Sequence, residues 1–357
     1  LTTSIALLLL NKLAPLLGLI DHPTSRKVHF KQTPLTGGLA IAFGGLTLYW
    51  LRPDILIEFT FILVGAVTLI IAGSLDDRNH LCHKKRLGIQ AFASGLAMLS
   101  GIHIESFSLF PDALPYSIAW ASYPITFFAL MASINAFNLI DGLDGLAGKI
   151  CLVALIPLCS LAYLSGDNAI ALLTTALIAS LMAFLCFNTP LPWRHQAKAF
   201  LVDAGSTSLG FIIGCLLIKS SQGTQPLIVP IDALWLVAIP MLDTASVIAL
   251  RVSKKQSAFT AAKDHLHHQL LDLGLSGSQT VWFITLSAAL FVTLNFLVKD
   301  IVSPEIRFSA FLALLFIHIL LSKALANGTP AKGSRFLALW PSFTTKKDRK
   351  DQHQLSS

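Results

Sequence analysis

Charged residues are scarce in this sequence. Asp, Glu, Lys and Arg make up 13% of its 357 residues, whereas apolar residues make up 54%. Soluble domains carry roughly 25% charged residues, about twice as many. The composition therefore excludes an ordinary soluble domain and predicts an integral membrane protein.

Cysteine is also sparse, and its arrangement excludes a disulfide framework or a zinc site. The five cysteines are odd in number, form no C-x-x-C pair and lie within or beside apolar runs. We expect them to be reduced thiols. Long polar stretches are missing too, the longest being 251–278 and the end after Asn327. We therefore predict one helical membrane domain over residues 1–326 and a basic, disordered tail over 327–357.

Apolar runs near the length of a membrane span recur along the chain. A helix needs about 20 apolar residues to cross a bilayer. The runs lie at about 1–19, 35–51, 55–74, 87–102, 117–138, 146–164, 169–187, 205–219, 230–250, 279–298 and 307–325. They predict an all-α, polytopic fold of about eleven transmembrane helices. The first run has no small-residue cleavage site before Asp21, so we expect a span there and not a signal peptide.

The basic residues predict the orientation of the bundle. Counted over alternate connections, 21 of the 26 lysines and arginines fall on one side of the membrane. The other side has only four, namely Arg52, Lys219, Lys299 and Arg307. The remaining residue, Lys12, lies inside the first apolar run. By the positive-inside rule the basic side faces the cytoplasm. The net charge of +7 is then explained by anionic lipid, and no nucleic-acid partner is expected.

The most informative polar segment is 133–148, which reads S-I-N-A-F-N-L-I-D-G-L-D-G-L-A-G. Amides, carboxylates and glycines each recur there at every third residue: Asn135, Asn138, Asp141 and Asp144, with Gly142, Gly145 and Gly148. On a helix this spacing aligns successive polar side chains on one side. Small residues beside carboxylates allow a phosphate or a metal-bound nucleotide to approach closely. One such residue could be a helix cap, but four in register favour a binding site.

Two further carboxylate segments fall on the same predicted side. In L-D-D-R, Asp76 and Asp77 directly follow an apolar run, which is costly unless a basic side chain or a divalent ion neutralises them. A structural salt-bridge cluster is the alternative there. In V-D-A-G-S-T, Asp203 stands at the start of a span, where helix amides and one carboxylate favour an anion and its metal. An ordinary N-cap is the alternative for Asp203.

Histidines lie close together in another polar segment, which reads K-D-H-L-H-H. His265, His267 and His268 lie in a loop that also holds several lysines, and they lack the H-x-x-x-H spacing of a zinc site. Imidazoles beside lysines favour hydrogen bonds to phosphate oxygens. Because all these loops share the predicted cytoplasmic side, we expect them to converge on one site for a magnesium-bound nucleotide.

With these motifs the chain resembles the polyprenyl-phosphate N-acetylhexosamine-1-phosphate transferase family, which includes bacterial enzymes that start O-antigen and teichoic acid chains, and the peptidoglycan translocase MraY. The resemblance runs from about Gly18 to Leu275. L-D-D-R matches the paired-aspartate motif, N-A-F-N-L-I-D-G-L-D-G-L-A matches N-x-x-N-x-x-D-G-x-D-G-L, and H-L-H-H resembles the H-I-H-H form of the WecA-type branch. V-D-A-G-S-T resembles G-D-x-G-S, with Val202 where the family has Gly.

The resemblance implies transfer of an N-acetylhexosamine 1-phosphate from a UDP-sugar to a polyprenyl phosphate such as undecaprenyl phosphate, with release of UMP. GlcNAc is the expected sugar, and a 6-deoxy relative is the alternative. The product would start a cell-surface glycan such as O-antigen. The implied cofactor is Mg²⁺, with Mn²⁺ as a substitute. The implied setting is the bacterial inner membrane, with the active site facing the cytoplasm and with an oligomer left open.

The resemblance also implies roles for individual residues. Asp203 would hold the metal, and four carboxylates would be catalytic: Asp76, Asp77, Asp141 and Asp144. The substrate-binding set would comprise Lys84, Arg86, Asn135, Asn138, His265, His267 and His268. Whether Asp76 or Asp77 accepts a proton, and whether an aspartate forms a covalent intermediate, both stay open.

Two other classes fit less well. A transporter places ionisable residues inside its spans, often in two repeated halves, whereas the acids in these motifs lie at span ends and no repeat is evident. A CDP-alcohol phosphotransferase would need an arginine soon after D-G-x-x-A, and here Asp141-Gly142 is followed by Leu143-Asp144-Gly145.

The predicted orientation is testable by cysteine labelling. Single cysteines are placed in a cysteine-free variant of the protein, and an impermeant thiol reagent is added to intact cells that express it. Cysteines at Ser25, Gln196 and Ser257 should not react, because the positive-inside rule puts them in the cytoplasm. Cysteines at Asp112 and Gln222 should react. Labelling at position 257 from outside would contradict a shared cytoplasmic face.

Overall fold

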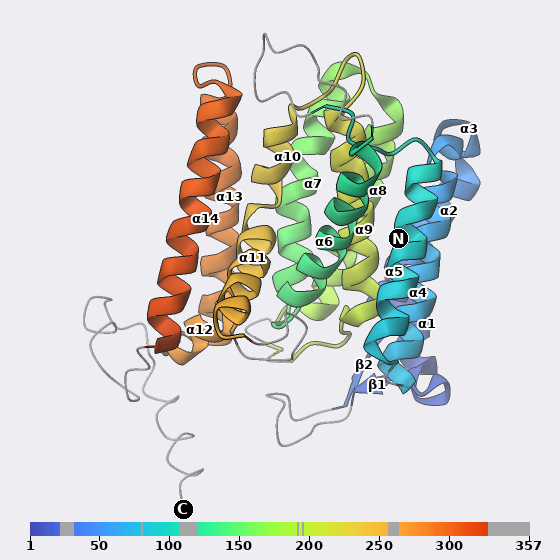
Figure 1. Ribbon diagram of the computed structural model, residues 1–357. Helices are drawn as coiled ribbons and strands as arrows, with labels where there is room; N and C mark the ends of the chain where they lie inside the picture. The colour runs from blue at the N-terminus through green and yellow to red at the C-terminus, as the bar shows by residue number, and fades with distance from the viewer. Residues whose placement is uncertain are drawn as a thin grey trace, which may run out of the picture.

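A computed structural model describes residues 1–21, 32–79, 81–106, 120–190, 193–194, 196–255 and 264–327. In these residues the chain is almost entirely helical (Figure 1). The helices are α1 (Thr2–Leu17), α2 (Gly37–Leu51), α3 (Pro53–Leu56), η1 (Ile57–Phe59), α4 (Thr60–Asn79), α5 (His83–Leu99), α6 (Ser122–Ile140), α7 (Leu146–Ser165), α8 (Asn168–Asn188), α9 (Val202–Ser221), α10 (Pro230–Leu236), α11 (Ala238–Ser253), α12 (Leu266–Asp272), α13 (Gly277–Val298) and α14 (Pro304–Asn327). Two short antiparallel strands, β1 (Ile20–Asp21) and β2 (Thr33–Pro34), complete the set.

The predicted all-α membrane fold is confirmed, but the number of spans is not. Each predicted apolar run coincides with a helix or a helix pair. Among the described residues, seven helical stretches are long and apolar enough to cross a membrane, and α10 with α11 would make an eighth. That pair is bent by 81°, and α1 and α2 are shorter apolar helices. The helix lengths therefore support seven or eight spans and do not confirm the predicted eleven. The predicted tail lies outside the described residues from 328 onward, so that prediction is untested.

Helix α9 forms the centre of the bundle. It packs between α4 and α6. Of the residues in its most apolar stretch, 83% are buried inside the protein, against 11% for α14 at the edge of the bundle. In Figure 1, α9 lies among α6, α7 and α8, whereas α13 and α14 stand together at the side. Asp203 lies in the first turn of α9. The most buried helix therefore carries one of the predicted site residues.

Glycines bring neighbouring backbones against that first turn. A Cβ added at Gly73 of α4 would lie 2.4 Å from the backbone of Ala204, and one at Gly38 of α2 would lie 2.4 Å from the amide nitrogen of Gly205. No real side chain tolerates such distances, so only glycine fits at both positions. The position of Asp203 is thus set by backbone contact with two other helices.

The segment before α9 is held by main-chain hydrogen bonds. The amide of Phe200 donates to the carbonyl of Pro34 (2.9 Å), and the amide of Gly37 donates to the carbonyl of Phe200 (2.9 Å). The β2–α2 connection therefore binds the entry to α9 much as a neighbouring strand would. This arrangement links the segment before α2 to the segment before α9.

A buried polar cluster joins the bent helix pair to α13 and α14 at the far end of the bundle. Asp232 of α10 accepts hydrogen bonds from Arg307 and from Asn295 (2.8 Å). All three side chains are buried. A buried carboxylate needs such a cation and donor, so this cluster fixes α10 in place.

The close approach at Gly73 predicts a specific loss of stability. Gly73→Ala should lower the unfolding temperature in detergent by several degrees, because overpacking costs about 1–3 kcal/mol. Gly45→Ala in α2 is the matched control, since nothing lies within 4 Å of the added Cβ. The control should leave the unfolding temperature unchanged or raise it, because alanine favours a helix by about 0.5–1 kcal/mol. Equal behaviour of the two variants would contradict the proposed backbone contact.

Candidate active site

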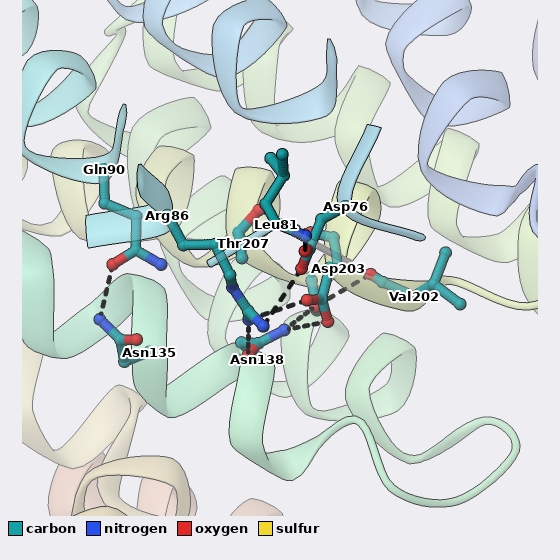
Figure 2. Close-up of polar contacts among 10 residues, drawn as sticks. Asp76, Leu81, Arg86, Gln90, Asn135, Asn138, Val202, Asp203 and Thr207 are labelled. Atoms are coloured by element: carbon teal, nitrogen blue, oxygen red, sulfur yellow. Dashed lines mark hydrogen bonds and ion pairs between the residues drawn. The ribbon is translucent and has the colours of Figure 1, made fainter. Parts of the chain in front are cut away.

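The predicted polar segments meet at one end of the bundle. The α4–α5 connection, the C-terminus of α6, the N-terminus of α9 and α12 all lie toward the lower end in Figure 1. Side chains from the first three of these segments form one connected network (Figure 2). Residues that are distant in sequence are thus brought together as expected.

Arg86 is the centre of this network. Its Nη1 lies 3.1 Å from Oδ2 of Asp76, and its Nη2 lies 2.8 Å from Oδ2 of Asp203. The guanidinium therefore bridges carboxylates from α4 and α9 (Figure 2). Arg86 was predicted to bind substrate, and here it balances the charge of the site itself.

Asn138 links α6 to the same carboxylate. Its Nδ2 donates to Oδ1 of Asp203 (2.7 Å) and to Oγ of Ser206 (3.0 Å). Asp76 has a further role, because its Oδ1 accepts the amide of Leu81 (2.6 Å) and closes the α4–α5 connection. Each carboxylate is therefore held in a defined orientation by at least two donors.

The every-third-residue pattern does not continue along one helix. Helix α6 ends at Ile140, and Asp141 to Gly145 form a turn in which Gly145 has a φ of +82°. The helical interpretation is thus right for Asn135 and Asn138 and wrong for Asp141 and Asp144. Glycines end the helix at low cost, so the turn projects the two carboxylates from a loop.

Asp141 is strongly influenced by its surroundings. Burial, and then the negative charges of Asp203, Asp144 and Asp77, raise the pKa of the Asp141 carboxyl to about 8. Burial alone can raise a carboxyl pKa, and the charge contributions add that Asp77, Asp144 and Asp203 lie near enough to Asp141 to act on it.

The turn is held by Asn188, a residue that the sequence analysis missed. Its Oδ1 accepts the amide of Gly145 (2.6 Å), and its Nδ2 donates to the carbonyl of Ala199 (2.9 Å). Asn188 is buried. It joins the turn after α6 to the segment that leads into Asp203, and only its place at the end of an apolar run marked it in sequence.

Two predicted substrate-binding residues are not partners of Arg86 in the described part of the chain. Lys84 is exposed on α5. Asn135 lies one helical turn before Asn138, and its Nδ2 donates to Oε1 of Gln90 (3.0 Å) and to the carbonyl of Met131 (2.7 Å). Figure 2 shows this second, smaller pair beside the main network. Gln90 was another residue without a sequence signal.

The histidine segment lies against the turn after α6. His265 precedes α12, and its Nδ1 is 2.9 Å from Oδ2 of Asp243 in α11. A Cβ added at Gly142 would lie 2.2 Å from Nε2 of His267, so this ring packs directly on the glycine. Burial, and then the neighbouring His268, lower the pKa of His267 to about 4. In the unliganded protein this low pKa favours the neutral form of His267 at pH 7.

The carboxylates could take part in binding Mg²⁺, although they do not form a complete protein cage. Among the described residues, no group of three or more His, Cys, Asp or Glu side chains is arranged to hold a metal. Mg²⁺ is commonly bound by one or two carboxylates together with substrate phosphates and water. A cavity of about 20 Å³ beside Asp76 and Asp203, and a buried Oδ2 of Asp77 without a hydrogen-bond partner, fit such a partial site.

This fold and site define a class: polytopic membrane proteins with a network of carboxylates, an amide and an arginine at one end of the helical bundle. Residues 59–221 match the model of glycosyl transferase family 4. The chain is 33% identical to the undecaprenyl-phosphate alpha-N-acetylglucosaminyl 1-phosphate transferase of Yersinia pestis, over 78% of this chain and 76% of that protein. The chain is 30% identical to the Escherichia coli K12 protein of the same name, over 83% of this chain and 81% of that protein.

A third relative comes from a distant bacterium. It is the probable undecaprenyl-phosphate N-acetylglucosaminyl 1-phosphate transferase of Bacillus subtilis, 32% identical over 90% of this chain and 88% of that protein. The chain belongs to the polyprenyl-phosphate N-acetylhexosamine-1-phosphate transferase family, within glycosyl transferase family 4. The family predicted from the motifs is thus confirmed, and the protein is a phosphoglycosyltransferase.

The backbone at Val202 generates a prediction. Val202 has a φ of +51°, a conformation that costs a residue with a Cβ about 1–2 kcal/mol. Val202→Gly should therefore be more stable than Val202→Ala by about 1 kcal/mol, measured as unfolding temperature. At an ordinary helical position such as Ala42 the order reverses, and Ala42→Gly should be destabilising by about 0.5–1 kcal/mol. A Val202→Ala protein at least as stable as Val202→Gly would contradict the left-handed backbone.

Proposed function

We propose that this protein transfers N-acetylglucosamine 1-phosphate from UDP-GlcNAc to undecaprenyl phosphate and releases UMP. The observation that carries the proposal is the network of Asp76, Asp203 and Asn138 around Arg86, contributed by four helices at one end of the bundle. The names of the bacterial relatives support the same donor group and acceptor lipid.

The chemistry exchanges one phosphoanhydride for another. An oxygen of the lipid phosphate attacks the β-phosphorus of the UDP-sugar, and a new P–O–P bond forms. The bond from that phosphorus to the bridging oxygen breaks, and the electron pair leaves with UMP. Because the nucleophile is already anionic, the protein must mainly position both phosphates and offset their charge.

The proposal gives the residues the roles that the family resemblance implies. Asp76 and Asp77 would lie at the acceptor phosphate, where either could accept the proton of a monoprotonated phosphate. Asp141 and Asp144 would line the nucleotide side with Asn138. Attack by an aspartate, with a covalent intermediate, is the alternative route.

Mg²⁺, or Mn²⁺ in its place, is part of the proposal. Asp203 would be its fixed protein ligand, beside Asp76 and the unpartnered oxygen of Asp77. The ion would neutralise negative charge on the diphosphate when bound. The raised pKa of Asp141, caused by burial and then by the neighbouring carboxylates, fits a cluster that has more negative charge than Arg86 alone offsets.

The setting follows from the charge distribution. We place the protein in the bacterial inner membrane, with the carboxylate end facing the cytoplasm, where nucleotide sugars are made. The lipid-linked product would start a cell-surface glycan such as O-antigen. A 6-deoxy-N-acetylhexosamine donor is the alternative substrate for the same chemistry.

The reaction is tested with purified protein, undecaprenyl phosphate and a panel of UDP-sugars. UDP-GlcNAc should yield UMP and a lipid that keeps both phosphates, and added UMP should regenerate the UDP-sugar. Asp203→Asn should lower turnover by about two to four orders of magnitude, because it removes the charged ligand proposed for the metal ion. Chelation of divalent ions should abolish activity, and Mg²⁺ should restore it.

Asp54→Asn is the matched control, because Asp54 pairs with Arg52 on an exposed surface. It should keep full activity. UDP in place of UMP would refute the proposed reaction, and near-normal turnover of a well-expressed Asp203→Asn protein would move the metal to another aspartate.

A further inference from the structure

Helix α11 contains a buried carboxylate that none of the sequence motifs includes. Asp243 is 2% exposed and lies in the middle of the helix. Its Oδ2 is 2.9 Å from Nδ1 of His265, and its Oδ1 accepts the amide of Leu266 (2.7 Å). Both contacts belong to the start of the histidine segment, 22 and 23 residues further along the chain.

These two contacts define the orientation of one imidazole. The carboxylate accepts a hydrogen bond from Nδ1 of His265, which assigns the proton to that nitrogen. The opposite ring nitrogen, Nε2, is then available for a second partner. A carboxylate behind a histidine also supports the protonated ring, as it does in metal and catalytic sites.

The orientation of the His265 ring influences the rest of the histidine segment. The rings of His265 and His267 are parallel within 9°, with centroids 6.0 Å apart. His267 in turn packs on Gly142, in the turn that carries Asp141 and Asp144. A second contact supports the same segment from the same helix, because Nε of Arg251 lies 3.7 Å from Oδ2 of Asp264. Asp243 and Arg251 are eight residues apart, so they lie near one face of α11.

The energetics favour a role beyond packing. A buried carboxylate is expensive unless it is paired or hydrogen-bonded, and an apolar side chain of similar size would stabilise α11 as well or better. Asp232, in the same bent helix pair, serves the fold, because it is paired with Arg307 and Asn295 of neighbouring helices. The two hydrogen bonds of Asp243 described above go instead to the histidine segment beside the site.

We propose that Asp243 is a positioning residue of the active site. It fixes the ring orientation and the protonated nitrogen of His265, and through the stacked histidines it sets α12 against the Asp141–Gly145 turn. When its ring is doubly protonated, His265 then donates Nε2–H to a phosphate oxygen of the substrate. This inference rests on the proposed phosphotransfer and adds a residue to it.

A double-mutant cycle tests the inference. Asp243→Asn keeps the shape, but its amide nitrogen would donate to Nδ1 of His265 and select the other tautomer. We expect kcat/KM for UDP-GlcNAc to fall about 10- to 100-fold, as for other residues that orient a functional histidine. In a His265→Ala background the same substitution should change kcat/KM less than about twofold, because residues in one hydrogen-bonded unit are not additive.

Asp232→Asn is the matched control. It makes the same change in the same bent helix pair, where the carboxylate serves only the fold. It should lower the unfolding temperature and leave kcat/KM per folded molecule unchanged in both backgrounds. If Asp243→Asn does not fold, Asp243→Glu takes its place in the cycle, because it keeps the charge and shifts the carboxylate by one methylene.

The outcomes separate this inference from the proposed function. Absence of UMP release by the wild-type protein would refute the function itself. An active wild-type protein in which the Asp243 substitution is neutral, or costs the same factor with and without His265, would refute the positioning role and leave the function standing.

Discussion

The site depends on the ionic bridge that Arg86 makes between Asp76 and Asp203. Carboxylates gathered at the end of an apolar bundle repel one another and are poorly solvated. Two opposite unit charges about 4 Å apart attract by about 4 kcal/mol at an effective dielectric constant of 20. One guanidinium with two acids therefore makes the cluster tolerable, but the further acids near it leave an excess of negative charge. In the proposed reaction, this excess would help to hold a divalent ion together with the substrate phosphates.

The backbone around α9 supports that bridge. Gly38 and Gly73 bring two other helices into contact with the turn that carries Asp203. Main-chain hydrogen bonds from Phe200 hold the entry to the same turn. Stability and function are thus coupled here, because movement of α2 or α4 displaces a carboxylate that must meet Arg86 within hydrogen-bonding distance.

The bent pair α10 and α11 shows two uses of a buried carboxylate. At one end of the bundle Asp232 is paired with Arg307 and locks α10 to its neighbours. In the other helix of the pair Asp243 is hydrogen-bonded to the histidine segment. The 81° bend sets the direction of α11, and hence the place from which Asp243 reaches His265. A single broken span therefore joins the fold to the site.

The sequence by itself determined the membrane fold and the family, and it supplied the candidate site residues as a prediction. Long apolar runs and the spacing of Asn135 and Asn138 are local properties, so they could be predicted before any contact was known. The pairing of Arg86 with Asp203, the turn at Asp141, the exposure of Lys84, and the roles of Asn188 and Asp243 were decided only by the tertiary structure. Each depends on segments that lie tens of residues apart or on the point where a helix stops. A single polar residue in an apolar run shows its type in the sequence, but its partner is set by how the helices pack.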